Sequence, residues 1–125
     1  MELSITKLLQ ILLLFAPFAA YGASAVTAST GPAVVTPFGT TLFATVDSHG
    51  SPTYAWFEYG QGSSLTTQTK QHFVSMHADI KSLSVELTNL EKNISYSYRV
   101  GAYNAYGAAY GQTQTFVTGV SGSNS

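Results

Sequence analysis

The segment Ile94–Asn104 reads ISYSYRVGAYN, and it carries the clearest fold signal in this chain of 125 residues. Apolar or aromatic residues stand at every second position, with other side chains between them. The apolar row is Ile94, Tyr96, Tyr98, Val100 and Ala102. Successive side chains of a strand point to opposite faces, so this alternation predicts a long strand with one face in a core. Gly101 interrupts the outer row, where a bulge or the close approach of another group is expected.

Shorter segments of the same kind lie before and after this strand, separated by turn residues at intervals of about ten. They cover residues 33–36, 40–47, 53–59, 65–70, 84–88 and 110–118, whereas residues 71–82 show no clear pattern. The side chains expected to face inward in the second and third segments are Leu42, Ala44, Val46, Ala55, Phe57 and Tyr59. No useful helical periodicity follows residue 25. We therefore expect an all-β protein, a sandwich of seven antiparallel strands.

Residues 1–25 have the features of a helical signal peptide. The largely apolar run at 8–20 is shorter than the roughly 20 residues that a helix needs to cross a bilayer. Ala23-Ser24-Ala25 places small residues at the two recognition positions, which predicts cleavage after Ala25. An uncleaved membrane anchor and a buried core helix are the alternatives.

With that leader removed, the chain is expected to divide into a linker at 26–31, one domain at 32–118 and a flexible Gly/Ser tail at 119–125. The mature protein would be secreted or held in the periplasm or cell envelope. We expect no stable insertion into a membrane after cleavage.

The composition excludes several classes of function. Charged residues make up 9% of the chain and the formal net charge is −1, so the clustered Lys and Arg that bind nucleic acid are lacking. Cysteine is absent, which excludes disulfides, cysteine-based zinc sites and thiol catalysis. A surface with so few charges must consist largely of neutral polar groups.

Five short motifs follow one another through the domain. They are WFEYG at 56–60, LTNL at 87–90, YSYRV at 96–100, NAYG at 104–107 and QTF at 114–116. In order and spacing they resemble the fibronectin type III superfamily, in the form common in secreted bacterial proteins.

This resemblance implies an immunoglobulin-like sandwich with strands A, B and E packed against C, C′, F and G. It also implies a tyrosine corner, in which the Tyr96 hydroxyl bonds to the backbone near Leu90. Many family members have a tryptophan in the second strand where this chain has Ala44. Phe57, Tyr98 and Tyr59 are expected to fill that volume.

The residues give little support to catalysis. His72, His77 and Asp79 are of types that could bind zinc, but loop histidines near one acid are more often polar surface. The acidic residues do not share a face of any predicted strand, and His49 lies in a Gly/Pro turn. We therefore expect no enzyme activity, no metal and no cofactor.

Several aromatic side chains are predicted to point away from the core, namely Phe43, Tyr54, Trp56, Tyr103, Tyr106 and Tyr110. They could stabilise the sheet by cross-strand packing, contact a protein partner or stack on sugars. Tyr54, Trp56 and Tyr106 are the candidate contact residues, Tyr106 because it stands at a turn with little to pack against.

Function is expected to reside in the surface. The first hypothesis is protein–protein interaction, adhesion or a spacer role, including self-association through an edge strand at 33–36 or 65–70. The alternative is a carbohydrate-binding accessory module that uses Tyr54 and Trp56.

Overall fold

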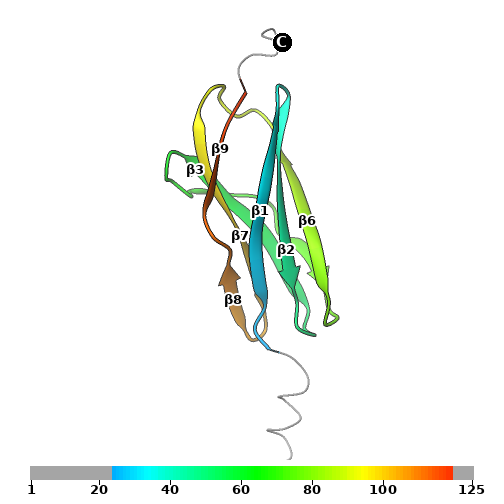
Figure 1. Ribbon diagram of the computed structural model, residues 1–125. Helices are drawn as coiled ribbons and strands as arrows, with labels where there is room; N and C mark the ends of the chain where they lie inside the picture. Colours follow the sequence, from blue (N-terminus) through cyan, green and yellow to red (C-terminus); the bar gives the residue numbers. More distant parts are fainter. Residues whose placement is uncertain (1–23, 120–125) are drawn as a thin grey trace, which may run out of the picture.

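The computed structural model describes residues 24–119, which form nine strands in two antiparallel sheets packed face to face (Figure 1). The strands are β1 (Thr27–Thr36), β2 (Gly39–Asp47), β3 (Thr53–Gln61), β4 (Thr67–Gln68), β5 (His72–Ser75), β6 (Ile80–Leu87), β7 (Ser95–Asn104), β8 (Gly107–Tyr110) and β9 (Gln114–Val117). The expected all-β sandwich is confirmed. No membrane-spanning helix occurs among these residues. Most of the predicted leader, and the tail from residue 120, lie outside the described range.

The smaller sheet has the order β1-β2-β6, and the larger sheet has β3 and β7 at its centre. β4 and β5 pair with one side of β3, while β8 and β9 pair with the opposite side of β7. The sheets therefore contain the strands expected of each. The described residues nevertheless form nine strands where seven were expected.

The two additional strands arise where the chain changes its partner. The strand expected at 110–118 shrinks to β9, which pairs with residues 95–98 of β7, while a separate strand, β8, ends at Tyr110 and pairs with residues 101–104. Between them Gly111 lies against Thr30, too close for a side chain, and its N–H donates to Val100 O (2.9 Å). The polar edge strand expected at 65–70 shrinks to β4, and β5 forms in the stretch that lacked a pattern.

The predicted linker at 26–31 is wrong, because most of it belongs to β1. Residues 27–30 pair with residues 44–47 of β2, and the preceding Val26 is 2% exposed. Gly31 and Pro32, which precede the strand expected at 33–36, lie in an irregularity of the β1–β2 ladder between Thr30 and Ala33, after which pairing resumes.

The core is filled by the inward rows that the sequence predicted. Leu42, Ala44 and Val46 of β2 are buried, as are Ala55 and Phe57 of β3. Tyr98 and Phe57 are the largest fully buried side chains, with ring centroids 6.5 Å apart, and Tyr59 packs against the same cluster. Ala44 belongs to the same buried cluster as these rings.

Two inward tyrosines of β7 connect distant parts of the chain through their hydroxyls. The Tyr96 hydroxyl accepts a hydrogen bond from the N–H of Glu91 (3.0 Å), the residue after Leu90, and its ring stacks on Phe116. The Tyr98 hydroxyl crosses the core and donates to Gly31 O of β1 (2.6 Å). The buried Tyr98 thus links the two sheets by a hydrogen bond to the partly buried Gly31.

Replacing Tyr98 with Phe should destabilise the protein, because it leaves Gly31 O without this donor while preserving the ring. We expect the free energy of unfolding to fall by about 1 kcal/mol, as measured by urea denaturation. Tyr106→Phe, at an exposed turn, is the matched control and should leave stability unchanged. Equal stability of the Tyr98→Phe protein and its parent would contradict a role for this bond.

Burial raises the pKa of Tyr98 above its ordinary value of 10.0. The hydroxyl therefore holds its proton more tightly in the folded than in the unfolded state, so stability is intact below the unfolded pKa and is lost as pH rises through the folded one. We therefore expect the free energy of unfolding to decrease as the pH rises above 10.0, the pKa of an ordinary tyrosine. The decrease should be smaller in Tyr98→Phe than in Tyr106→Phe; equal slopes would count against this cause.

Candidate functional site

Five aromatic side chains gather on the outer surface of the larger sheet, and we call this surface the aromatic face. It consists of Phe73 of β5, Tyr54 and Trp56 of β3, Tyr103 of β7 and Tyr110 of β8. The strand register brings them together. Tyr54 lies opposite both Phe73 and Tyr103, and Gly101 lies between Trp56 and Tyr110. Residues opposite one another in a sheet share a face, so all five point away from the core.

The rings of the aromatic face form one continuous series of contacts. Their centroids are 5.6 Å apart for Phe73 and Tyr54, 5.7 Å for Tyr54 and Tyr103, 6.0 Å for Tyr103 and Trp56, and 6.2 Å for Trp56 and Tyr110. Four rings remain substantially exposed: Phe73 by 54%, Tyr54 by 38%, Tyr103 by 39% and Tyr110 by 48%. The rings thus pack against one another in the absence of a partner, and four of them remain accessible to one.

Trp56 differs from the other four, because it is only 6% exposed although it points outward. Its expected role as an exposed contact residue is therefore wrong. Opposite it stands Gly101, where a Cβ would lie 2.7 Å from two indole carbons. The missing side chain lets the indole lie against the backbone of β7, while Tyr103 and Tyr110 cover its sides. Trp56 supports the exposed rings from the centre of the face.

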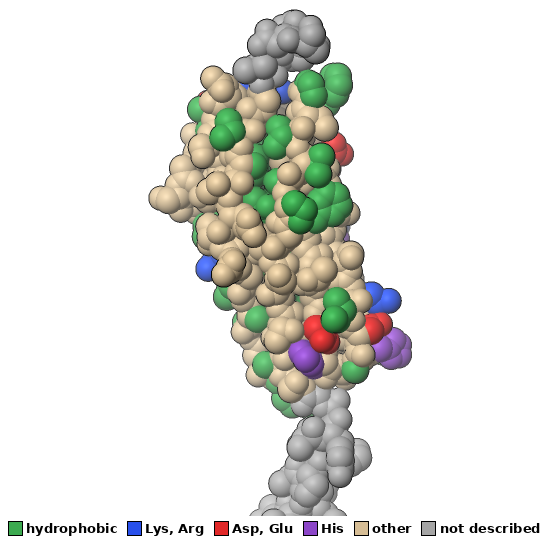
Figure 2. Space-filling model, viewed as in Figure 1, with side chains coloured by type: hydrophobic (Ala, Val, Ile, Leu, Met, Phe, Trp, Pro, Cys, Tyr) green, Lys and Arg blue, Asp and Glu red, His purple; other side chains and the backbone are tan. Residues whose placement is uncertain are grey.

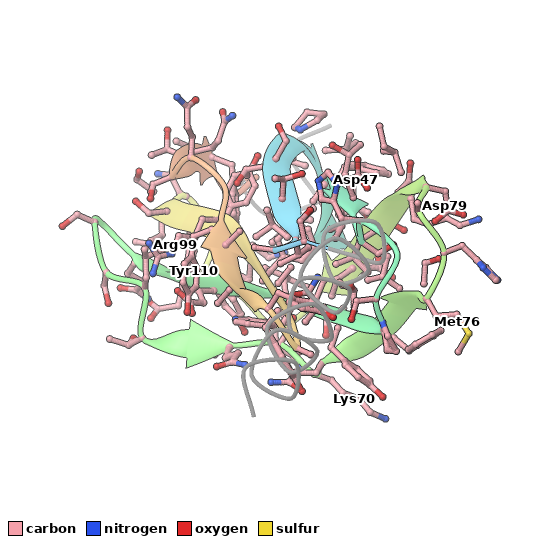
Figure 3. All side chains as sticks on the ribbon, turned by 90° about the horizontal axis from the view of Figure 1, so that it is seen from below. Asp47, Lys70, Met76, Asp79, Arg99 and Tyr110 are labelled. Carbon is pink, nitrogen blue, oxygen red and sulfur yellow. The ribbon has the colours of Figure 1, made fainter. Side chains whose placement is uncertain are left out.

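One end of the aromatic face carries a neutralised pair of charges. Arg99 and Glu58 lie opposite each other on β7 and β3, with Arg99 Nε 2.9 Å from Glu58 Oε1. The guanidinium carbon lies 4.2 Å from the Tyr110 ring centroid, a cation–π contact, and Figure 3 shows these two side chains together. Glu58 also accepts from the Trp56 indole (3.3 Å). The face therefore combines Tyr and Trp with an Arg whose charge is paired.

Tyr106 is exposed, as the sequence predicted, but it belongs to a different part of the surface. It lies in the two-residue turn between β7 and β8, where its N–H donates to Asn104 Oδ1 (2.9 Å). None of the ring contacts of the aromatic face involves it. The structure thus brings together Tyr54 and Trp56 among the three predicted contact residues, and leaves Tyr106 apart.

Phe73 and Arg99 were not predicted as site residues. Phe73 lies in the stretch whose pattern was unclear, and only its pairing with β3 shows that it joins Tyr54. Arg99 could have been found from the alternation of β7, which places it on the same face as Tyr103. Phe43 is also partly exposed, but it lies on β2 of the other sheet, opposite Ser84.

The residues considered for a metal site are not gathered. Within residues 24–119, no group of three or more His, Asp or Glu side chains could hold a metal ion. Asp79 accepts a hydrogen bond from the Ser75 hydroxyl (2.8 Å) and pairs with Lys81 (3.4 Å). The Ser75 hydroxyl foremost, and then Lys81, lower the pKa of Asp79 below its ordinary value.

Each of the two edge strands expected to add a strand from a partner, at 33–36 and 65–70, offers only a short or interrupted edge. β4, which replaces the expected edge at 65–70, pairs with β3 at two positions only. β1 is an edge of the smaller sheet, but its ladder is interrupted between Thr30 and Ala33. On the side formed by β1, β2 and β9, most of the surface is neutral (Figure 2). The aromatic face is the more extensive candidate for contact.

Comparisons with known proteins identify the fold without identifying a family. No family model matches the chain, and no curated protein is similar to it in sequence. The fibronectin type III resemblance therefore stays a prediction.

Similar solved structures include three of the sensor domain of the anti-sigma factor RsgI4 from Pseudobacteroides cellulosolvens. A short version of that domain gives a TM-score of 0.59 at 20% identity, over 76% of this chain and 95% of that one. Its solution structure gives 0.58 at 18%, over 74% of each chain, and a long version gives 0.53 at 17%, over 76% and 90%. At these identities the similarity concerns the fold alone.

Replacing Gly101 with Ala should disturb the support of the aromatic face, because the new methyl group overlaps the Trp56 indole. We expect a loss of about 1–3 kcal/mol in the free energy of unfolding and a red shift in the emission of Trp56, the only tryptophan of the chain. Gly119→Ala is the control, since its Cβ would meet its nearest atoms at 3.6 Å. Unchanged emission and stability in Gly101→Ala would show that the indole does not need this space.

Proposed function

We propose that this chain is a secreted, non-catalytic binding module that contacts a protein partner through the aromatic face. The observation that carries the proposal is the continuous row of packed, accessible rings around Trp56. Tyrosine, tryptophan and arginine are the residues that most often dominate the energy of protein interfaces. Here all three residue types lie on one sheet. The chain as a whole contains few charged residues.

The packing among the rings favours binding, because it reduces what the side chains lose on association. Rings held by their neighbours have already given up much of their rotational freedom, so a partner orders them at a smaller entropic cost. Tyr54 and Tyr103 stack within 22° of parallel, and Trp56 is held between Tyr103 and Tyr110. The salt bridge between Arg99 and Glu58 limits the unpaired charge that a partner would have to desolvate.

The same geometry makes carbohydrate stacking the second choice. A sugar ring needs an aromatic ring whose flat side is free. The Tyr54 and Tyr103 rings stack on each other, and Trp56 is buried, so the pair first expected to bind sugar does not offer two open flat sides. Exposed tyrosine edges with their hydroxyls are better suited to the mixed apolar and polar surface of a protein.

The shared fold supports a recognition role in general terms. The structurally similar proteins are described as sensor domains, and sensing requires a surface that recognises something. We include secretion in the proposal because of the leader-like first 25 residues. More specific roles differ in the partner. A fibronectin type III-like spacer would contact a neighbouring domain, an adhesion module would contact another surface protein, and self-association would join a second copy of this chain.

A photo-crosslinking amino acid placed at residue 110, in the full chain produced by cells that secrete it, tests the proposal. We expect crosslinks to protein from this position and few from residue 43, the matched aromatic position on the other sheet. The double change Tyr54→Ser and Tyr103→Ser should reduce the crosslinks at residue 110 severalfold. A product of twice the chain mass would identify a second copy as the partner.

A glycan array with the same proteins separates the two kinds of ligand. Binding to a glycan that is lost in the Tyr54→Ser and Tyr103→Ser protein would replace the protein partner by a carbohydrate. Equal crosslinking at residues 110 and 43, with no glycan bound, would contradict a binding role for this face.

A further inference from the structure

A phenylalanine ring stands almost free of contacts at the turn between β1 and β2. Phe38 is 84% exposed, more than any other large hydrophobic side chain among residues 24–119. The backbone around it is held in place, because the Thr36 hydroxyl oxygen accepts from Phe38 N (3.2 Å) and from Gly39 N (3.2 Å). Lys92 Nζ donates to Pro37 O (2.8 Å). The turn therefore presents an apolar ring with a positive charge close to it.

A hollow lies at the other end of the same hairpin. Its volume is about 190 Å³, and it is lined by residues 27–29 of β1, residues 45–47 of β2 and Ile80 of β6. Small side chains such as Ser29 and Thr45 leave this space open, while Ile80 supplies an apolar side chain that is 68% exposed. After Phe38, Ile80 is the most exposed large hydrophobic side chain of the part of the chain that the structure describes.

The ring and the hollow match in size and in charge. A cavity of about 150 Å³ can hold a benzene ring, so the hollow has room for the phenyl group of Phe38. The ring would contact Ile80 and the methyl group of Thr45 there. Asp47 supplies a carboxylate at the hollow and Lys92 an ammonium group at the turn, so the two surfaces carry opposite charges.

Phe38 cannot reach the hollow of its own chain. The β1–β2 ladder runs from the pair Thr27–Asp47 to the pair Thr36–Gly39, and its two ends lie at opposite ends of the sandwich (Figure 1). The ring and the hollow are therefore separated by the length of the hairpin. Two copies of the chain, by contrast, can bring a ring and a hollow together.

We propose that copies of this chain associate head to tail, with Phe38 of one copy in the hollow of the next. Two different surfaces meet in such a contact, so each pair keeps a free ring at one end and a free hollow at the other, and the row can extend. One ring buries little surface compared with a stable interface, so the association depends strongly on concentration. The contact involves neither the aromatic face nor an edge strand, and it is independent of the proposed function.

Sedimentation velocity of the full chain, purified from a host that secretes it, tests the proposal over a concentration series that extends to the millimolar range. We expect dimers and longer species to increase with concentration. Phe38→Ser removes the ring and Ser29→Trp fills the hollow, so each variant alone should remain a monomer. An equimolar mixture of the two variants should form dimers and nothing larger, because each pair has one intact ring and one intact hollow to join.

Two matched controls should associate like the parent chain. Phe73→Ser removes an exposed ring from the aromatic face, and Ser84→Trp adds an indole at an exposed position of β6 outside the hollow. A parent chain that stays monomeric throughout, association that persists in Phe38→Ser, or a mixture that forms no dimers would each overturn the proposal. Loss of association in Phe73→Ser would assign the self-contact to the aromatic face and overturn it as well.

Discussion

The structure depends on β7, which is hydrogen-bonded to strands on both of its sides. β3 pairs with β7 from residue 96 to 103, and β8 and β9 share its other side. A strand fixed in this way cannot shift its register, because a shift by one residue would turn its apolar row to solvent. The register therefore fixes the side of the sheet to which each side chain of β7 points. Alternate residues of this strand build the core on one side and the aromatic face on the other.

On the inner side, the rows of β7 and β3 allow the chain to fold without disulfides and without a core tryptophan. Tyr98 and Phe57 supply large rings, and the Tyr98 hydroxyl finds an acceptor on β1 in the other sheet. A buried hydroxyl without a partner would be unfavourable, so this bond restricts how β1 can lie across the core. The change in the β1–β2 ladder at Gly31 occurs where the acceptor is needed.

On the outer side, the same two strands place the tryptophan on the solvent-facing side of an antiparallel sheet, which usually carries polar side chains. Gly101 is what makes this possible, because its missing side chain receives the indole. The tryptophan then supports neighbouring rings instead of filling the core. A polar counterpart lies at the end of the sandwich, where Asn104 connects the N-terminal segment with two loops. Both devices act between segments far apart in the chain.

The sequence by itself determined the fold class, the inward rows of β2, β3 and β7, and the outward direction of Tyr54 and Trp56, because alternation along a strand is a local property. The burial of Trp56, the arrival of Phe73 beside Tyr54 and the continuation of β1 through Gly31-Pro32 were decided only by the tertiary structure. Each of these depends on which residue lies opposite on a neighbouring strand. Such pairing is a relation between distant segments, and no pattern within one segment contains it.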